Sequence, residues 1–81
     1  MAMATESKTV FAENLRFLIY ANGYGFREFS RVAGLHYSLL KRYMAGSATP
    51  RPARVRVLAK VLGVTPGALV FDKLTPDTEQ L

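Results

Sequence analysis

Residues 26–46 of the 81-residue chain read FREFSRVAGLHYSLLKRYMAG. Apolar residues recur at helical spacing on both sides of Gly34, which predicts two helices of about two turns each, over 26–33 and 37–44. Gly34 can adopt a positive φ without a side-chain clash, so the chain can reverse sharply there, and Leu35 can fill the gap between the helices. This part of the chain therefore predicts two short helices joined by a tight turn.

On either side of this pair, glycine and proline divide the chain into three more segments with helical periodicity. The helices expected there cover about 10–22, 52–62 and 66–71, with Thr9 capping the first and Thr65 the last. No segment shows the sustained alternation of apolar and polar residues that is typical of a strand. The predicted fold class is all-α, a compact bundle of five helices. The side chains expected to face its core are Phe11, Leu15, Leu18, Ile19, Phe26, Phe29, Val32 or Ala33, Leu40, Tyr43, Val55, Leu58, Ala59 and Leu62.

Size and composition favour one small domain. With 49% apolar and 21% charged residues, the chain can fold around a single hydrophobic core. We expect a flexible N-terminal arm over 1–9, the folded domain over 10–71 and a flexible C-terminal tail over 72–81. The absence of cysteine excludes disulfides and thiolate zinc sites. The longest apolar run, 17–21, is far shorter than the roughly 20 residues of a membrane span, and 1–10 lack the apolar centre of a secretory signal, so we expect a cytoplasmic protein.

Charge is distributed unevenly along the chain. The formal net charge is +5, but between Phe11 and Phe71 nine basic residues stand against only Glu13 and Glu28, because the other acids lie in the tails. A folded part this basic favours a polyanion as partner. The alternative is a basic, soluble surface without a specific partner.

Joined together, these features resemble the DNA-binding domains of the lambda-repressor and Cro-type helix-turn-helix family. The similarity extends from Phe11 to Phe71. The residues that carry it are Leu15, Leu18, Phe29, Ser30, Gly34, Leu35, Leu40, Tyr43, Gly46, Pro50, the run Leu58-Ala59-Lys60-Val61-Leu62-Gly63-Val64, Thr65 and Leu69.

The resemblance implies that the helix over 37–44 lies in the major groove of double-stranded DNA, with its N-terminal residues towards base edges. Because Leu40 and Tyr43 should face the core, the opposite side of this helix is left to contact DNA. The family's base-contacting positions match Tyr37, Ser38 and Arg42, of which Arg42 can donate two hydrogen bonds to guanine. Phosphate contacts are expected from Arg27, Lys41, Arg51 and Arg54.

A domain of this family reads about half of a usual operator, so the resemblance also implies a homodimer and a palindromic operator. Contacts between the two copies are expected from Val70, Phe71 and Leu74. Val57 and Val61 form a second apolar stripe. Alternatively, all five side chains complete the core of the monomer.

The function predicted from the sequence is a sequence-specific transcriptional regulator, a repressor of bacterial or phage type. The competing hypothesis is a protein-interaction module of the same fold, such as an antitoxin or anti-repressor, which apolar residues at Phe26, Leu39 and Met44 would suit. One histidine, no cysteine and two folded acids give no nucleophile–base pair, metal-ligand cluster or glycine-rich phosphate loop. We therefore expect no enzyme activity, no catalytic residue, no metal and no cofactor.

Overall fold

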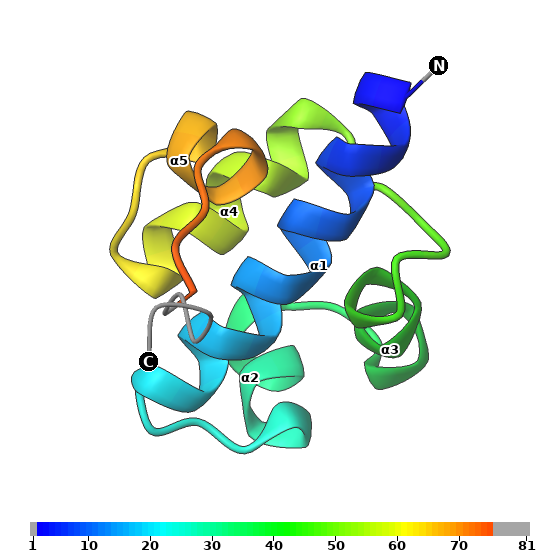
Figure 1. Cartoon of the computed structure of the whole chain (residues 1–81). Helices are drawn as coiled ribbons and strands as arrows, with labels where there is room; N and C mark the ends of the chain where they lie inside the picture. Colours follow the sequence, from blue (N-terminus) through cyan, green and yellow to red (C-terminus); the bar gives the residue numbers. More distant parts are fainter. Residues whose placement is uncertain (1, 76–81) are drawn as a thin grey trace.

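The computed structural model describes residues 2–75 of the chain, with side chains from Thr9 onwards. Five helices, joined by short loops, lie in this range. The helices are α1 (Ala2–Ala21), α2 (Phe26–Ala33), α3 (Tyr37–Met44), α4 (Pro52–Leu62) and α5 (Pro66–Phe71) (Figure 1). Within that range no residue is in a strand. The predicted all-α bundle is confirmed, and the four shorter helices lie where they were expected.

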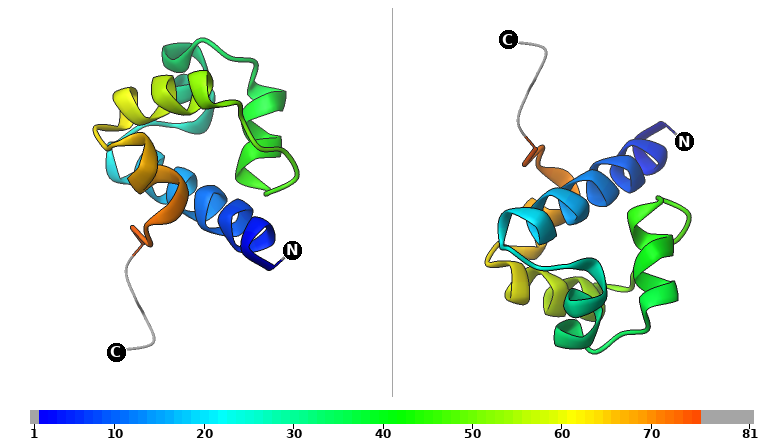
Figure 2. Two further views of the ribbon diagram at one scale, coloured as in Figure 1. Left: turned by 90° about the horizontal axis from the view of Figure 1, so that it is seen from above. Right: turned by 90° about the horizontal axis from the view of Figure 1, so that it is seen from below.

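Helix α1 is the longest element and contacts both α3 and α5, while α2 packs against α3 and α4. The two views in Figure 2 show α1 along one side of the bundle and α2, α3 and α4 opposite it. The core between them contains the apolar faces of all five helices, including Phe11, Leu15 and Ile19 of α1. Burying each such large side chain contributes about 1.5–3 kcal/mol. The bundle therefore holds the α2–α3 pair against a continuous core.

The turn between α2 and α3 forms at Gly34, which has φ +73°. Beyond it, the Leu35 N–H donates to the Ser30 carbonyl at 2.9 Å, which satisfies a carbonyl left free at the end of α2. The Leu35 side chain packs partly buried against the core. Sequence reasoning predicted both roles, because only a residue without Cβ takes this conformation at no cost.

Helix α1 begins earlier than predicted, at Ala2 instead of about Val10. No glycine or proline occurs between Ala2 and Ala21, so nothing in the sequence stops the helix from extending toward the N-terminus. The backbone of the expected N-terminal arm over 1–9 is therefore helical from Ala2 on. Thr9 lies inside α1, and its expected role as a helix cap is wrong.

Buried Asn14 ties the segment after α5 to α1. Its side chain is 1% exposed; Nδ2 donates to the carbonyls of Leu69 at 2.9 Å and Asp72 at 2.6 Å, and Oδ1 accepts from the Leu74 N–H at 3.0 Å. The first residues of the expected flexible tail over 72–81 are therefore hydrogen-bonded to the bundle up to Leu74. The rest of that tail, 76–81, lies outside the described residues.

The structure corrects one expectation about the core side of α2 and decides another that was left open. Phe26 was expected to face inward but is 40% exposed, and of Val32 and Ala33 only Ala33 is buried. The buried face of α2 consists of Phe29, Ser30 and Ala33. Phe26 is the first residue of the helix, where no preceding turn holds the ring against the bundle.

Candidate nucleic-acid interface

The two sides of α3 differ sharply in burial. Leu40 and Tyr43 are buried in the core, as predicted, and the Tyr43 ring meets Phe11 of α1 edge to face with centroids 6.1 Å apart. On the opposite side, Ser38 and Arg42 are exposed to solvent. These two predicted base-contacting side chains are therefore free to meet a partner, and Tyr37 at the start of the helix is partly buried.

Helix α3 begins with hydrogen bonds of its own backbone and ends at a contact with α1. At its start, the backbone N–H groups of Leu39 and Leu40 both donate to the carbonyl of His36, the N-cap residue, at 3.1 Å. The His36 side chain is exposed and makes no capping hydrogen bond, so it is a passive turn residue. At its end, Arg16 Nη1 of α1 donates to the Met44 carbonyl.

Tyr37 lies beside two of the predicted phosphate-contacting residues. Arg27, the second residue of α2, has its Cζ 4.4 Å from the centroid of the Tyr37 ring. Lys41, one turn further along α3, has its Nζ 5.6 Å from the same centroid. The fold thus brings the start of α2 and the start of α3 together at one aromatic ring.

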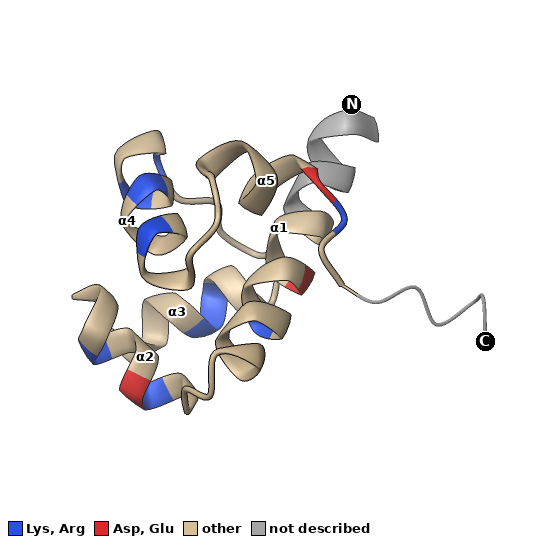
Figure 3. Ribbon diagram, turned by 90° about the vertical axis from the view of Figure 1, so that its left-hand side faces the viewer, with Lys and Arg blue, Asp and Glu red and all other residues tan. Residues whose placement is uncertain are grey.

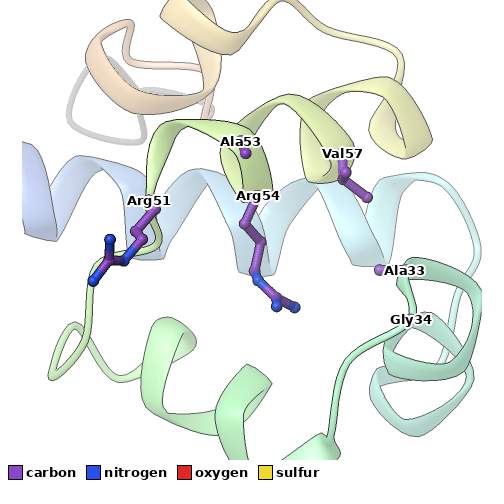
Figure 4. A pocket seen from close by; sticks show the side chains of 6 residues that line it. All are labelled: Ala33, Gly34, Arg51, Ala53, Arg54 and Val57. Atoms are coloured by element: carbon purple, nitrogen blue, oxygen red, sulfur yellow. The ribbon is translucent and has the colours of Figure 1, made fainter.

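The other two predicted phosphate contacts lie at the start of α4. Arg51 is the exposed N-cap residue of this helix, and Arg54 is partly buried in its first turn. Both line a groove of about 380 Å³ between α4 and the turn at Gly34, and Figure 4 shows their side chains extending away from α4. Ala33, Ala53 and Val57 line the rest of the groove. This gives α4 a basic edge beside the turn.

Positive charge is spread over α2, α3 and α4, as Figure 3 shows. Arg27, Lys41, Arg51 and Arg54 form no ion pair with a carboxylate within residues 9–75. Glu28, which follows Arg27 directly, instead accepts a hydrogen bond from the Gly25 N–H at 3.2 Å, where it caps α2. These cations therefore keep their charge available for an external anion.

Of the three apolar side chains that favoured a protein partner, Phe26, Leu39 and Met44, two are mostly covered and one is exposed. Met44 is 7% exposed and belongs to the core, and Leu39 packs partly against it. Phe26 alone of the three presents a large exposed apolar surface. Apolar exposure on the α2–α3 pair is therefore smaller than the sequence suggested.

A second groove, of about 480 Å³, runs between the start of α4 and α5. Among its lining residues are Pro50, Pro52, Val55, Pro66, Val70 and Phe71. Of the predicted dimer contacts, Phe71 is 69% exposed and Val70 is partly buried. Leu74 is also partly buried and packs against the core.

Two contacts in the domain were not singled out from the sequence. Arg16 was not among the residues expected to make a specific contact, and its bond to α3 crosses 28 positions, so no local spacing could indicate it. Asn14 did leave a signal: it occupies the apolar stripe of α1, three residues after Phe11 and four before Leu18. A polar residue in such a stripe needs hydrogen-bond partners, and Asn14 has them.

The described residues contain neither a cluster of metal ligands nor a helix that could span a membrane. No group of three or more His, Asp or Glu within that part of the chain is arranged to hold a metal ion. Among the same residues, no helix combines the length and apolar character needed to cross a membrane.

Comparison with known proteins bears on this arrangement. A family model described as a helix-turn-helix domain matches residues 10–70. No curated protein matches the chain significantly. Among solved structures, the solution structure of the SOS-response transcriptional repressor LexA from Eubacterium rectale is similar, with a TM-score of 0.77 and 28% sequence identity; the match covers 90% of this chain and 79% of that chain.

Proposed function

The chain belongs to the helix-turn-helix domain family, and we propose that it is a sequence-specific regulator of transcription that binds double-stranded DNA in the cytoplasm and represses by occupying its operator. The observation that carries this proposal is the exposed side of α3, which has Ser38 and Arg42 outward and Leu40 and Tyr43 in the core. A similar solved structure is that of a protein named as a transcriptional repressor, which supports the repressor role.

In this proposal α3 docks in the major groove and its outer side chains contact base edges. Arg42 donates two hydrogen bonds to O6 and N7 of a guanine, and Ser38 donates or accepts one. The Tyr37 hydroxyl is the third candidate for a base contact. Discrimination at each position thus depends on very few side chains.

Four cations flank these groups and hold the DNA backbone. Arg27 and Lys41 lie at the start of the α2–α3 pair, and Arg51 and Arg54 lie at the start of α4. Each phosphate contact releases condensed counterions, which contributes affinity without base preference. The two groups of cations thereby fix the orientation of α3 on the duplex.

Two copies of the chain are proposed to bind one palindromic operator, because a single α3 reads only half of it. The isologous contact is made by Val70, Phe71 and Leu74 around α5. The exposed Phe71 and the apolar groove next to it support this choice, since a dimer would cover both.

A salt titration tests the proposal. Binding to a duplex of mixed sequence is measured by fluorescence anisotropy over a range of salt concentrations. Four phosphate contacts per chain, each contributing about −0.9 to the slope of log K against log salt, predict a slope of about −4 if one chain binds and about −7 if a dimer binds. No binding at low salt, or a slope near zero, would contradict the proposal.

The second candidate is a protein-interaction module of the same fold. The exposed Phe26 at the start of α2 is the observation that favours it, because an exposed aromatic ring suits a protein partner better than a phosphate. A partner held through such apolar contacts would be retained at high salt, whereas DNA would be released.

A further inference from the structure

The geometry around Tyr37 points to a site for one backbone phosphate that is shared by α2 and α3, in which the Tyr37 ring positions Arg27 and Lys41 and contacts no base. This inference deepens the proposed function and rests on it. It assigns Tyr37 to orientation of the cations instead of to base recognition.

The ring lies within cation–π distance of both charges. Arg27 Cζ is 4.4 Å and Lys41 Nζ is 5.6 Å from its centroid, inside the limit of about 6 Å for this attraction. Tyr37 and Lys41 are four residues apart on the same side of α3, whereas Arg27 comes from α2. One ring therefore joins charges from the two helices of the motif.

Both the ring and the Arg27 backbone are held in place. Tyr37 is partly buried and packs against the core, so the ring is not free to turn into solvent. The buried Ser30 hydroxyl donates to the Arg27 carbonyl at 2.6 Å. A cation resting on a fixed ring samples fewer rotamers, so less freedom is lost when it binds an anion.

No carboxylate competes for these charges. Glu28 follows Arg27 directly, but its carboxylate accepts from the Gly25 N–H at the start of α2. Neither Arg27 nor Lys41 forms an ion pair within residues 9–75. Two unneutralised like charges beside one ring favour an anion, and attraction to the ring leaves the N–H donors of both groups available to it.

A backbone phosphate fits this site better than a base edge does. Its oxygens accept hydrogen bonds from guanidinium and ammonium groups at once. Because two cations lie against the Tyr37 ring, apolar contact of that ring with a thymine methyl is hindered. Only the Tyr37 hydroxyl is left as a possible base contact. Replacing Tyr37 with Phe removes the hydroxyl and keeps the ring, so the two roles can be tested apart.

The test compares Tyr37→Phe, which keeps the ring, with Tyr37→Leu, which removes it. Binding is measured on the duplex that the wild-type chain selects from a random pool and on a scrambled duplex. We expect Tyr37→Leu to weaken binding to both by about fivefold, equivalent to one cation–π pair, and Tyr37→Phe to restore wild-type affinity and the same selected motif. Tyr20→Leu, at an exposed tyrosine of α1, is the matched control.

A double-mutant cycle separates positioning from a merely structural effect. In an Arg27→Gln/Lys41→Gln background the ring has no cation to orient, so Tyr37→Leu should weaken binding no further. The inference is wrong if Tyr37→Leu keeps its full effect there, if it tightens binding, or if Tyr37→Phe changes the preferred base at any position.

The contact of the two cations with the Tyr37 ring can also be tested by NMR on the wild-type chain, without any variant. The Lys41 Hε and Arg27 Hδ protons should show upfield ring-current shifts by NMR, and these should persist when the selected duplex is added. Loss of both shifts on DNA binding would overturn the inference. If the wild-type chain selects no duplex, the proposed function fails as well; if it selects one and Tyr37→Phe alters the motif, only the role given to Tyr37 fails.

Discussion

Some single residues in this domain make long-range contacts that their sequence neighbours do not indicate. Asn14 is the clearest case, because one amide joins α1, the end of α5 and the segment that follows it. A leucine would have nearly the same volume but would leave two carbonyls and one N–H without their partner. Such groups lose free energy when they are buried unpaired.

We predict that Asn14→Leu lowers the free energy of unfolding by about 2 kcal/mol. The measurement is urea denaturation followed by circular dichroism. Asn22→Ala serves as the control, because Asn22 is exposed just after α1 and its side-chain amide donates only to the Leu18 carbonyl at the end of that helix. Equal losses in the two variants would show that Asn14 has no special role.

At the same scale, Arg54 is expected to contact phosphate and not a base. Arg54→Ala should therefore weaken binding to every duplex by a similar factor and make the salt slope less negative by about 1 for each chain bound. Arg56→Ala removes the same charge from the other groove, next to α5, and should change the slope little. A loss confined to one duplex sequence would instead place Arg54 among the base contacts.

At the scale of elements, the turn at Gly34 sets how α2 and α3 meet. An added Cβ there would touch nothing within 4 Å, so the cost of substitution is the positive φ alone. We predict that Gly34→Ala destabilises the domain by about 1 kcal/mol in thermal or urea unfolding. Gly67→Ala is the matched control, because Gly67 lies in α5 with equally open space around it but without a positive φ. This substitution should leave the stability of the domain unchanged or raise it.

Elements ended by glycine or begun by proline could be predicted from the sequence, because those residues act on their own backbone. This is why α2 ends at Gly34, α4 has Pro52 in its first turn and ends at Gly63, and α5 begins at Pro66, as expected. The start of α1 could not be located, since no such residue marks it. Phe26 was predicted wrongly for a related reason: periodicity assigns a side of the helix to a residue but does not show whether another element covers that side.

The candidate site was predictable to a similar degree. Helical spacing correctly left Ser38 and Arg42 on the outer side of α3. The meeting of Arg27 with Tyr37 was not predictable, because it depends on how α2 and α3 pack around the turn and not on any local pattern. Contacts such as those of Asn14 with Leu74 and Arg16 with Met44 are set by the tertiary fold in the same way.

At the scale of the whole molecule, the proposal separates two surfaces. In the proposed function, the outer side of α3 and the flanking cations contact DNA, and the region around α5 contacts a second copy of the chain. We predict that Phe71→Asp gives a monomer in sedimentation velocity at concentrations where the wild-type chain is a dimer. The fold should persist in circular dichroism, because the Phe71 side chain is 69% exposed in the single chain. A dimer of unchanged affinity would place the interface elsewhere.

The direct test of DNA reading by α3 is selection from a random pool of duplexes by the wild-type chain and by Arg42→Ala, side by side. The wild-type chain should enrich one palindromic motif. Arg42→Ala should enrich the same motif with the preference relaxed at a single base pair of each half, at a cost of about 1–3 kcal/mol for the best duplex. An identical motif from both proteins, or no enrichment by the wild-type chain, would contradict the assignment of α3 as the helix that reads DNA.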